Sequence, residues 1–129
     1  MHKKLVIMGA SGHGKVVADI ALKLQKYDEI VFLDDNEEVK ECMNFPVVGK
    51  SFDAKQYIEK ADFFVAIGNG KTRRKLTEQL QQMQAKIVTL IHPMAVIGEN
   101  VVIEKAIIGS GAAIRRGCRI GNGNNIAPS

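Results

Sequence analysis

The sequence contains no tryptophan, only two tyrosines, three prolines and two cysteines among its 129 residues. The cysteines, Cys42 and Cys118, lie far apart and form no CxxC pair. We expect two free thiols and no metal site, since a zinc site needs about four suitably spaced ligands. Aromatic residues make up only 5% of the chain, so a platform for stacking nucleic-acid bases is poorly supplied. Nucleic acid is therefore not an expected partner.

The sequence also lacks an apolar run approaching the ~20 residues that a membrane-spanning helix needs, so no membrane partner is expected. Residues 1–10 (MHKKLVIMGA) begin like a signal peptide, but SGHGK follows directly, which predicts a mature cytoplasmic start. The composition, 46% apolar and 25% charged, is that of a globular chain with one domain, or one domain and a short appendage. A net charge of +4 is compatible with an anionic ligand.

Hydrophobic periodicity predicts alternating strands and helices in the first two thirds of the chain. Buried strands are expected over residues 4–8, 29–33, 61–67 and 86–91, and helices over 15–25 and 72–84. Residues 37–50 read as irregular, with a short extended piece at 45–48, and Ser51 or Asp53 is expected to cap a brief helix reaching Glu59. This alternation predicts an α/β fold, a Rossmann-like parallel sheet with right-handed crossovers.

The pattern changes after His92-Pro93. Helical periodicity ends, and aliphatic residues recur at an interval of six, at Val96, Val102, Ile108, Ile114, Ile120 and Ile126. A six-residue period with aliphatic residues and glycine predicts a parallel β-helix built from hexapeptide repeats. We therefore expect two domains, residues 1–91 and 92–129.

Gly9 to Gly14 form a glycine-rich turn between a predicted strand and a predicted helix. Glycines allow close approach of a phosphate, and the helix N-terminus offers unpaired N–H groups and positive potential. The spacing is GxxGxG rather than the dinucleotide GxGxxG, which weakens a nicotinamide interpretation. Gly9, Gly14 and Lys15 nearly match the Walker pattern, but Val16 has no hydroxyl for magnesium.

Polar residues follow the second and third predicted strands. Asp34 and Asp35 end the second strand, where an acidic residue meets a ribose or base edge in Rossmann-like domains. Gly68 and Asn69 end the third strand at the same sheet edge. His13 is a candidate ligand contact, and Arg73, nearest this edge in a basic run, is a candidate phosphate contact. A plain turn at the aspartates and a solvated face at the basic run are the alternatives.

The motifs GASGHGK, LDD, FVAIGN and TLIHP, followed by hexapeptide repeats, occur in that order. This combination resembles bacterial sugar acetyltransferases of the sialic acid O-acetyltransferase and UDP-4-amino-sugar N-acetyltransferase family. The resemblance implies a Rossmann-like domain that binds a UDP-sugar, followed by a left-handed β-helix. It also implies a homotrimer with acetyl-CoA in grooves between neighbouring β-helices, and no metal.

By this resemblance Ser11, Gly12 and His13 hold the nucleotide sugar, Asp34 and Asp35 meet uracil and ribose, and Gly68 and Asn69 form the family's IGN turn. The family's catalytic base is a histidine in a later coil, with an acidic neighbour. This chain has no histidine after His92, which matches a structural His-Pro at the entrance to the β-helix. We therefore expect the catalytic coil and the later acetyl-CoA coils to be missing, and we assign no catalytic residue. Arg115, Arg116 and Arg119 either meet coenzyme A phosphates or form a solvated face.

The first hypothesis is therefore an acetyl-CoA-dependent acetyltransferase of a UDP-activated amino sugar, shortened in its β-helix. A non-catalytic nucleotide-sugar-binding module or assembly partner is the second. An NAD-dependent oxidoreductase is the third, disfavoured by the loop spacing and by the lack of a substrate domain.

Overall fold

The computed structural model describes residues 4–97 and five two-residue strands between residues 98 and 129. These later strands are β9 (Val102–Ile103), β10 (Ile107–Ile108), β11 (Ala113–Ile114), β12 (Arg119–Ile120) and β13 (Asn125–Ile126). Cys118 lies outside the described residues, and Cys42 is a buried free thiol. Among the described helices, none has the length and apolar character needed to cross a membrane.

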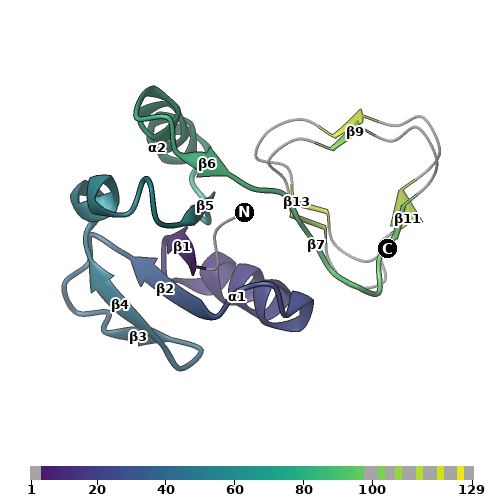
Figure 1. Ribbon diagram of the computed structural model, residues 1–129, viewed down its shortest axis with the longest axis horizontal. Coiled ribbons are helices and arrows are strands. Elements are labelled where there is room, and N and C mark those ends of the chain that lie inside the picture. The colour runs from purple at the N-terminus through teal and green to yellow at the C-terminus, as the bar shows by residue number, and fades with distance from the viewer. Residues whose placement is uncertain are drawn as a thin grey trace.

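A six-stranded sheet forms the first part of the chain (Figure 1). Its order is β3 (Glu41–Cys42), β4 (Phe45–Gly49), β2 (Glu29–Leu33), β1 (Lys4–Met8), β5 (Asp62–Val65) and β6 (Lys86–Ile87). All neighbours pair in parallel except β3 and β4. This mixed α/β sheet confirms the Rossmann-like prediction for the first part of the chain.

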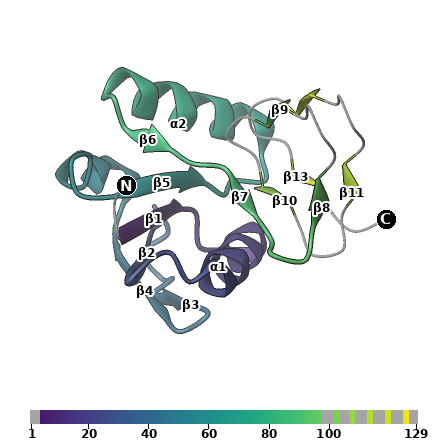
Figure 2. The same cartoon turned by 45° about the vertical axis from the view of Figure 1, so that its right-hand side comes forward.

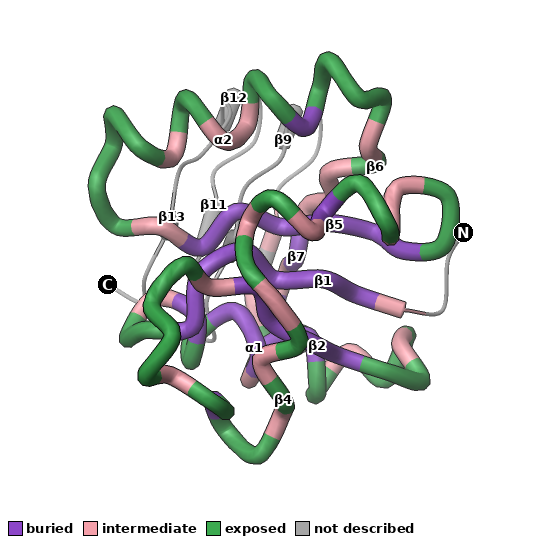
Figure 3. The backbone as a smooth tube through the Cα atoms, turned by 90° about the vertical axis from the view of Figure 1, so that its left-hand side faces the viewer, coloured by how far each residue is buried: buried purple, intermediate pink, exposed green. Residues whose placement is uncertain are grey.

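Alternate residues of the central strands bury against helices on opposite faces of the sheet, as the two-residue strand period requires. Leu5 and Ile7 pack in one core cluster with residues of α1 (Gly12–Leu24). Val6 and Met8 pack in the other, with residues of the 3-10 helix η1 (Ser51–Gln56) and of α2 (Gly70–Gln82). Figure 2 shows α1 and α2 on opposite sides of the sheet, and Figure 3 shows β1, β2 and β5 as its buried centre.

Residues 37–50, expected to be largely irregular, contain a β-hairpin. Strands β3 and β4 pair antiparallel, with Cys42 opposite Phe45. The two residues between them, Met43 and Asn44, have φ values of 51° and 68°. Positive φ at both turn residues is the conformation that joins two strands through a two-residue loop. The prediction missed this hairpin because methionine is not a residue that signals such a turn.

Both long helices begin earlier than their apolar periodicity predicts. Helix α1 begins at Gly12 rather than Lys15, so Gly12, His13 and Gly14 form its first turn. Helix α2 begins at Gly70 rather than Thr72. A first helical turn of glycine and polar residues has no apolar stripe, so periodicity alone does not detect it.

The single strand expected over residues 86–91 is wrong, because this segment passes from one sheet to another. Lys86–Ile87 forms β6 and pairs with β5, whereas Leu90–Ile91 forms β7 and pairs with β10. Val88 still donates its N–H to the Phe63 carbonyl at 3.0 Å. A continuous apolar run is compatible with burial in either sheet, so its sequence does not reveal the change of partner.

The short strands from β7 onward pair in parallel in three sets, β7-β10-β13, β8 (Val96–Ile97) with β11, and β9 with β12. The pairing corrects the expected repeat register. Ile97 pairs with Ile114, and Ile103 pairs with Ile120. Val96 and Val102 therefore lie one position out of step with the later aliphatic residues, although both are in strands. The six-residue spacing is interrupted by a five-residue step between Ile103 and Ile108.

The amino edge of the sheet carries a buried carboxyl group. Asp62 is only 2% exposed, and its Oδ2 accepts a hydrogen bond from the Tyr27 hydroxyl at 2.8 Å. Burial, followed by the Asp62 contact, raises the pKa of Tyr27. Tyr27 therefore stays protonated at neutral pH and donates its hydrogen bond to the buried Asp62 carboxyl group.

Candidate functional site

Three loops meet at the carboxyl edge of the central strands. They follow β1, β2 and β5, and β1 lies between β2 and β5 in the sheet. The chain therefore passes from β1 to β2 on one side of β1, and later adds β5 on the other side. In open parallel sheets, ligands bind outside the carboxyl ends of strands at such a switch point.

The loop after β1 is tied to the end of β2 by its own backbone. Gly9 has φ of 108° and donates its N–H to the Leu33 carbonyl at 2.8 Å. Ala10 donates its N–H to Asp34 Oδ2, also at 2.8 Å. Ser11 is the N-cap of α1 and is exposed. The first N–H groups of a helix have no intrahelical acceptor, so this turn presents donors at the sheet edge.

The glycines of the candidate site fall into two kinds. A Cβ at Gly9 would lie 2.6 Å from the Ala66 carbonyl oxygen, and one at Gly14 would clash with the Gly9 carbonyl. Packing alone therefore explains these two glycines. A Cβ at Gly12 or Gly68 would have no neighbour within 4 Å. These positions border open space, where the lack of a side chain leaves room for a ligand.

The paired aspartates point to different partners. Asp34 Oδ2 accepts from Ala10 N, and its Oδ1 accepts from Asn36 N at 2.8 Å. Asp35 Oδ1 accepts from the Ser51 N–H at 2.8 Å and from its hydroxyl at 2.9 Å. A carboxylate has about four acceptor sites, so Asp34 retains acceptor capacity for a ligand.

The side chains of Asn69 and Arg73 stabilise the loop after β5 by hydrogen bonds to its backbone and to the first turn of α2. Asn69 is the N-cap of α2, and its Oδ1 accepts from Lys71 N at 3.0 Å and Thr72 N at 3.1 Å. The Arg73 guanidinium folds back and donates to the Ile67 carbonyl at 3.1 Å. Arg73 thus lies partly buried at the sheet edge, whereas Lys71, Arg74 and Lys75 are exposed, as expected for a solvated face.

His13 lies in the first turn of α1 and is under the electrostatic influence of Arg73, in the first turn of α2. Burial, followed by the positive charge of Arg73, lowers the pKa of His13 below its usual 6.5. His13 is therefore mainly neutral at pH 7, and it can either donate or accept a hydrogen bond. A negatively charged ligand beside both residues would reverse the effect of Arg73.

We expect the His13 ring to titrate below pH 6.5, and an Arg73→Gln variant to titrate closer to 6.5. Because the folded pKa is lowered, the stabilising contribution of neutral His13 is complete above 6.5 and is lost as the pH falls below it. NMR titration of the ring, assigned with His13→Gln, measures both pKa values. A His13 pKa above 6.5, or one unchanged by Arg73→Gln, would contradict this electrostatic account.

A pocket of about 300 Å³ opens beside Asp34, between the loop after β2 and strand β4. Its lining includes Asn36, Val39 and Val47, together with Glu37 and Lys50, whose side chains form an ion pair at 2.5 Å. Within the described ranges, no three His, Cys, Asp or Glu residues are grouped so that they could hold a metal ion.

The described site gathers most of the residues named from the sequence. Ser11, Gly12, His13, Asp34, Gly68, Asn69 and Arg73 all lie on the three loops or the adjoining first helical turns. Asp35 instead joins η1 through Ser51. Sequence reasoning did not identify Ala10 or Ser51 as partners of the aspartates, because these contacts span 24 and 16 positions.

The remaining residues singled out from the sequence lie outside the three loops. His92 is 7% exposed, and its Nδ1 accepts from Met94 N at 3.0 Å, which agrees with a structural role. Arg115 and Arg116 lie outside the described residues, and only the strand is described for Arg119.

Residues 4–80 match the family model of the PglD N-terminal domain. Over 116 residues the chain is 32% identical to UDP-N-acetylbacillosamine N-acetyltransferase of Bacillus subtilis (strain 168). That match covers 87% of this chain and 51% of the relative. The chain thus spans about half the length of this curated relative.

The chain is also similar to solved structures of acetyltransferases. One neighbour is the acetyltransferase domain of PglB from Neisseria gonorrhoeae in complex with acetyl coenzyme A. Its TM-score is 0.78 at 32% identity, covering 98% of this chain and 65% of that chain. Another is PerB from Caulobacter crescentus in complex with CoA and GDP-perosamine. Its TM-score is 0.86 at 28% identity, with coverage of 97% and 60% respectively.

Proposed function

The chain belongs to the PglD N-terminal domain family, and we propose that its sheet domain holds the nucleotide of a UDP-activated amino sugar for acetylation by acetyl-CoA. The B. subtilis relative is a UDP-sugar N-acetyltransferase by name, and the PglB domain binds acetyl coenzyme A. Both observations support an acetyltransferase.

One observation carries the proposal: the first turns of α1 and α2 and the acceptor Asp34 all follow the carboxyl ends of central strands, at the switch point of the sheet. Both helix N-termini provide positive potential for a diphosphate, and α1, whose N-cap makes no side-chain hydrogen bond, provides N–H donors as well. Arg73 adds a positive charge whose field reaches His13. Gly12 and Gly68 border open space that a ligand can enter. These features suit a nucleotide diphosphate better than a neutral metabolite.

The site residues then have distinct roles. Ser11, Gly12, His13, Gly68 and Arg73 surround the diphosphate and the start of the sugar. Asp34 accepts a hydrogen bond from the ribose or the base, and Asp35 helps to form the neighbouring wall. Asn69 stabilises the first turn of α2, because its side-chain oxygen accepts hydrogen bonds from the N–H groups of Lys71 and Thr72.

Acetyl-CoA would supply the acetyl group, and no described residue is assigned to hold it or to act as the base. The sequence contains no histidine after His92. A nucleotide-sugar-binding module is therefore kept as the second candidate, because the described residues group a candidate nucleotide site and no assigned base.

The paired short strands support a second unit, a left-handed β-helix of hexapeptide repeats. Partners lie 17 or 18 positions apart, for example Leu90, Ile107 and Asn125, which is close to three hexapeptides. Because β7 already pairs with β10, we place the division between Ile87 and Leu90 rather than after Ile91. A homotrimer and a cytoplasmic location complete the proposal and rest on the family resemblance.

Calorimetric titration with UDP, with NAD in a parallel cell, tests the proposal. Saturable UDP binding without NAD binding is the expected result, since GxxGxG is not the dinucleotide spacing. NAD binding alone would overturn the proposal and favour an oxidoreductase. Release of coenzyme A from acetyl-CoA with a UDP-amino sugar then separates the acetyltransferase from the binding module.

A further inference from the structure

The acidic turn after β2 is held by the segment that leads into η1. The Asp34 N–H donates to the Gly49 carbonyl at 3.0 Å, which fixes the backbone of the turn. The Ser51 N–H donates to Asp35 Oδ1 at 2.8 Å, and the Ser51 hydroxyl lies 2.9 Å from each of the two carboxylate oxygens. Two donors of one residue therefore hold the Asp35 side chain.

Ser51 is itself held in place by the packing of η1. It is the first residue of this helix, and the Lys50 N–H just before it donates to Asp53 Oδ2 at 2.9 Å. Ala54 of η1 is only 1% exposed and packs in the core cluster that contains Leu33, the last residue of β2. The core therefore sets the position of Ser51 relative to the end of β2, and through it the position of the Asp35 carboxylate.

This contact orients Asp35 and leaves part of its carboxylate available. Asp35 is exposed, and an exposed aspartate side chain ordinarily samples several rotamers. A serine hydroxyl has one proton, so Ser51 fills two acceptor sites of the carboxylate at a time, and about two of roughly four remain. Asp35 is therefore oriented before a ligand arrives and can still accept hydrogen bonds. Orienting a group in advance removes the entropic cost of ordering it on binding.

The two ends of a nucleoside diphosphate differ in the hydrogen bonds that they can make. Its ribose hydroxyls and the N–H of uracil can donate, whereas the diphosphate is anionic and accepts. Carboxylates at the turn after β2 therefore suit the nucleoside, and helix N-termini suit the diphosphate. Resting on the proposed function, we propose that Ser51 is a positioning residue for the nucleoside part of the substrate. It acts by orienting Asp35 and does not contact the ligand itself.

A double-mutant cycle with UDP calorimetry tests whether Ser51 acts through Asp35. Ser51→Ala removes the hydroxyl and keeps the N–H, so it is expected to weaken UDP binding roughly fivefold, and Asp35→Ala roughly tenfold. The double variant should bind UDP no more weakly than Asp35→Ala alone, because no carboxylate is left for Ser51 to orient. Two independent contributions would instead multiply, to a loss of roughly 50-fold.

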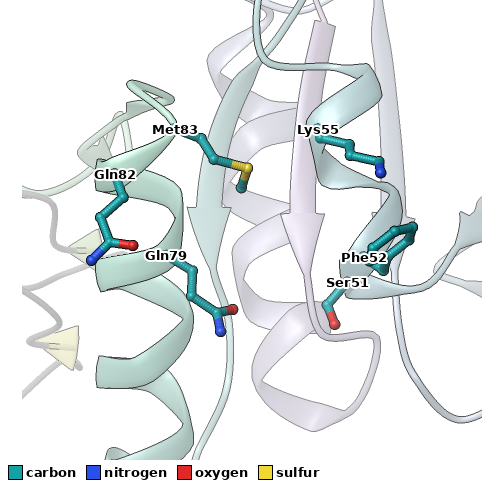
Figure 4. A pocket seen from close by; sticks show the side chains of 6 residues that line it. All are labelled: Ser51, Phe52, Lys55, Gln79, Gln82 and Met83. Carbon is teal, nitrogen blue, oxygen red and sulfur yellow. The ribbon is translucent and has the colours of Figure 1, made fainter.

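Ser51→Thr is the conservative variant that should restore binding. It keeps both donors, so we expect the UDP affinity of the unchanged chain. The added methyl group has open space beside it, because Ser51 lines a groove of about 350 Å³ between η1 and α2. Figure 4 shows Ser51 on the η1 side of this groove, across from Gln79 and Met83 of α2.

Gln56→Ala is the matched control in the same short helix. Gln56 is exposed, and its amide nitrogen lies 3.4 Å from Asp53 Oδ1 rather than near Asp35. This variant should bind UDP as the unchanged chain does. Thermal unfolding of each variant reports whether it folds.

Three outcomes would overturn the inference while the proposed function stands. They are UDP affinity unchanged in Ser51→Ala, a double variant whose loss is the product of the two single losses, and a loss in Ser51→Thr as large as that in Ser51→Ala. In each of them the unchanged chain still binds UDP. If the unchanged chain does not bind UDP, the proposed function fails and this inference fails with it.

Discussion

Replacing Gly9 by alanine is expected to lower the free energy of unfolding by roughly 2–5 kcal/mol. Gly9 has φ of 108°, a backbone conformation that side chains with a Cβ rarely adopt. The added Cβ would also lie 2.6 Å from the Ala66 carbonyl oxygen and 2.7 Å from Ile67 Cδ1. The Ala66 carbonyl oxygen is a backbone atom of the residue that follows β5. Rotating a side chain therefore cannot relieve the clash with it.

Gly12→Ala is the matched comparison in the same loop. A Cβ at Gly12 meets nothing within 4 Å, so we expect unchanged or slightly higher stability in this first helical turn. UDP binding should nevertheless weaken, because the methyl group occupies the open space assigned to the phosphate. Urea unfolding and UDP calorimetry on both variants make the comparison. Equal stability loss in Gly9→Ala and Gly12→Ala would refute the distinction between packing glycines and binding glycines.

Asp34→Ala is expected to weaken UDP binding by roughly 100-fold and to destabilise the chain by about 1–3 kcal/mol. The loss of hydrogen bonds that UDP would donate to the Asp34 carboxylate accounts for the weaker binding. The stability loss arises because the N–H groups of Ala10 and Asn36 lose their acceptor. Calorimetry and urea unfolding measure the two effects separately.

Asp34→Asn separates the ligand contact from the loop contact, since the amide keeps one acceptor oxygen and loses the charge. We expect it to retain more stability than Asp34→Ala but to remain weak in UDP binding. Asp19→Ala serves as the control, because Asp19 lies on α1 and, within the described part of the chain, forms an exposed i,i+4 ion pair with Lys23. UDP affinity unchanged in Asp34→Ala would exclude Asp34 from the site.

The location of the candidate site was largely predictable from local sequence. Gly9 to Gly14, Asp34 and Gly68-Asn69 each follow a strong apolar run. Carboxyl ends of parallel strands share one edge, so these residues were expected to meet. Individual partners were not predictable: Asn69 is occupied by capping α2, and Asp35 is bound by Ser51. Such contacts depend on side-chain direction, which spacing does not specify.

Tertiary pairing also decided the register of the repeats. The six-residue period singled out Val96 and Val102, but pairing places Ile97 and Ile103 beside Ile114 and Ile120. Adjacent aliphatic residues are equivalent by composition, and only the partner strand selects which one is in register.

By itself, the sequence determined the types of the main helices and central strands, the α/β class and the edge of the sheet at which polar loops gather. These features depend on local hydrophobic periodicity and on glycine-rich turns, which act over a few residues. The tertiary structure decided where residues 86–91 change sheets, which atoms hold Asp34 and Asp35, and that a groove lies between η1 and α2. Those features depend on contacts between segments far apart in the chain, which form only when burial of both faces of the sheet brings the segments together.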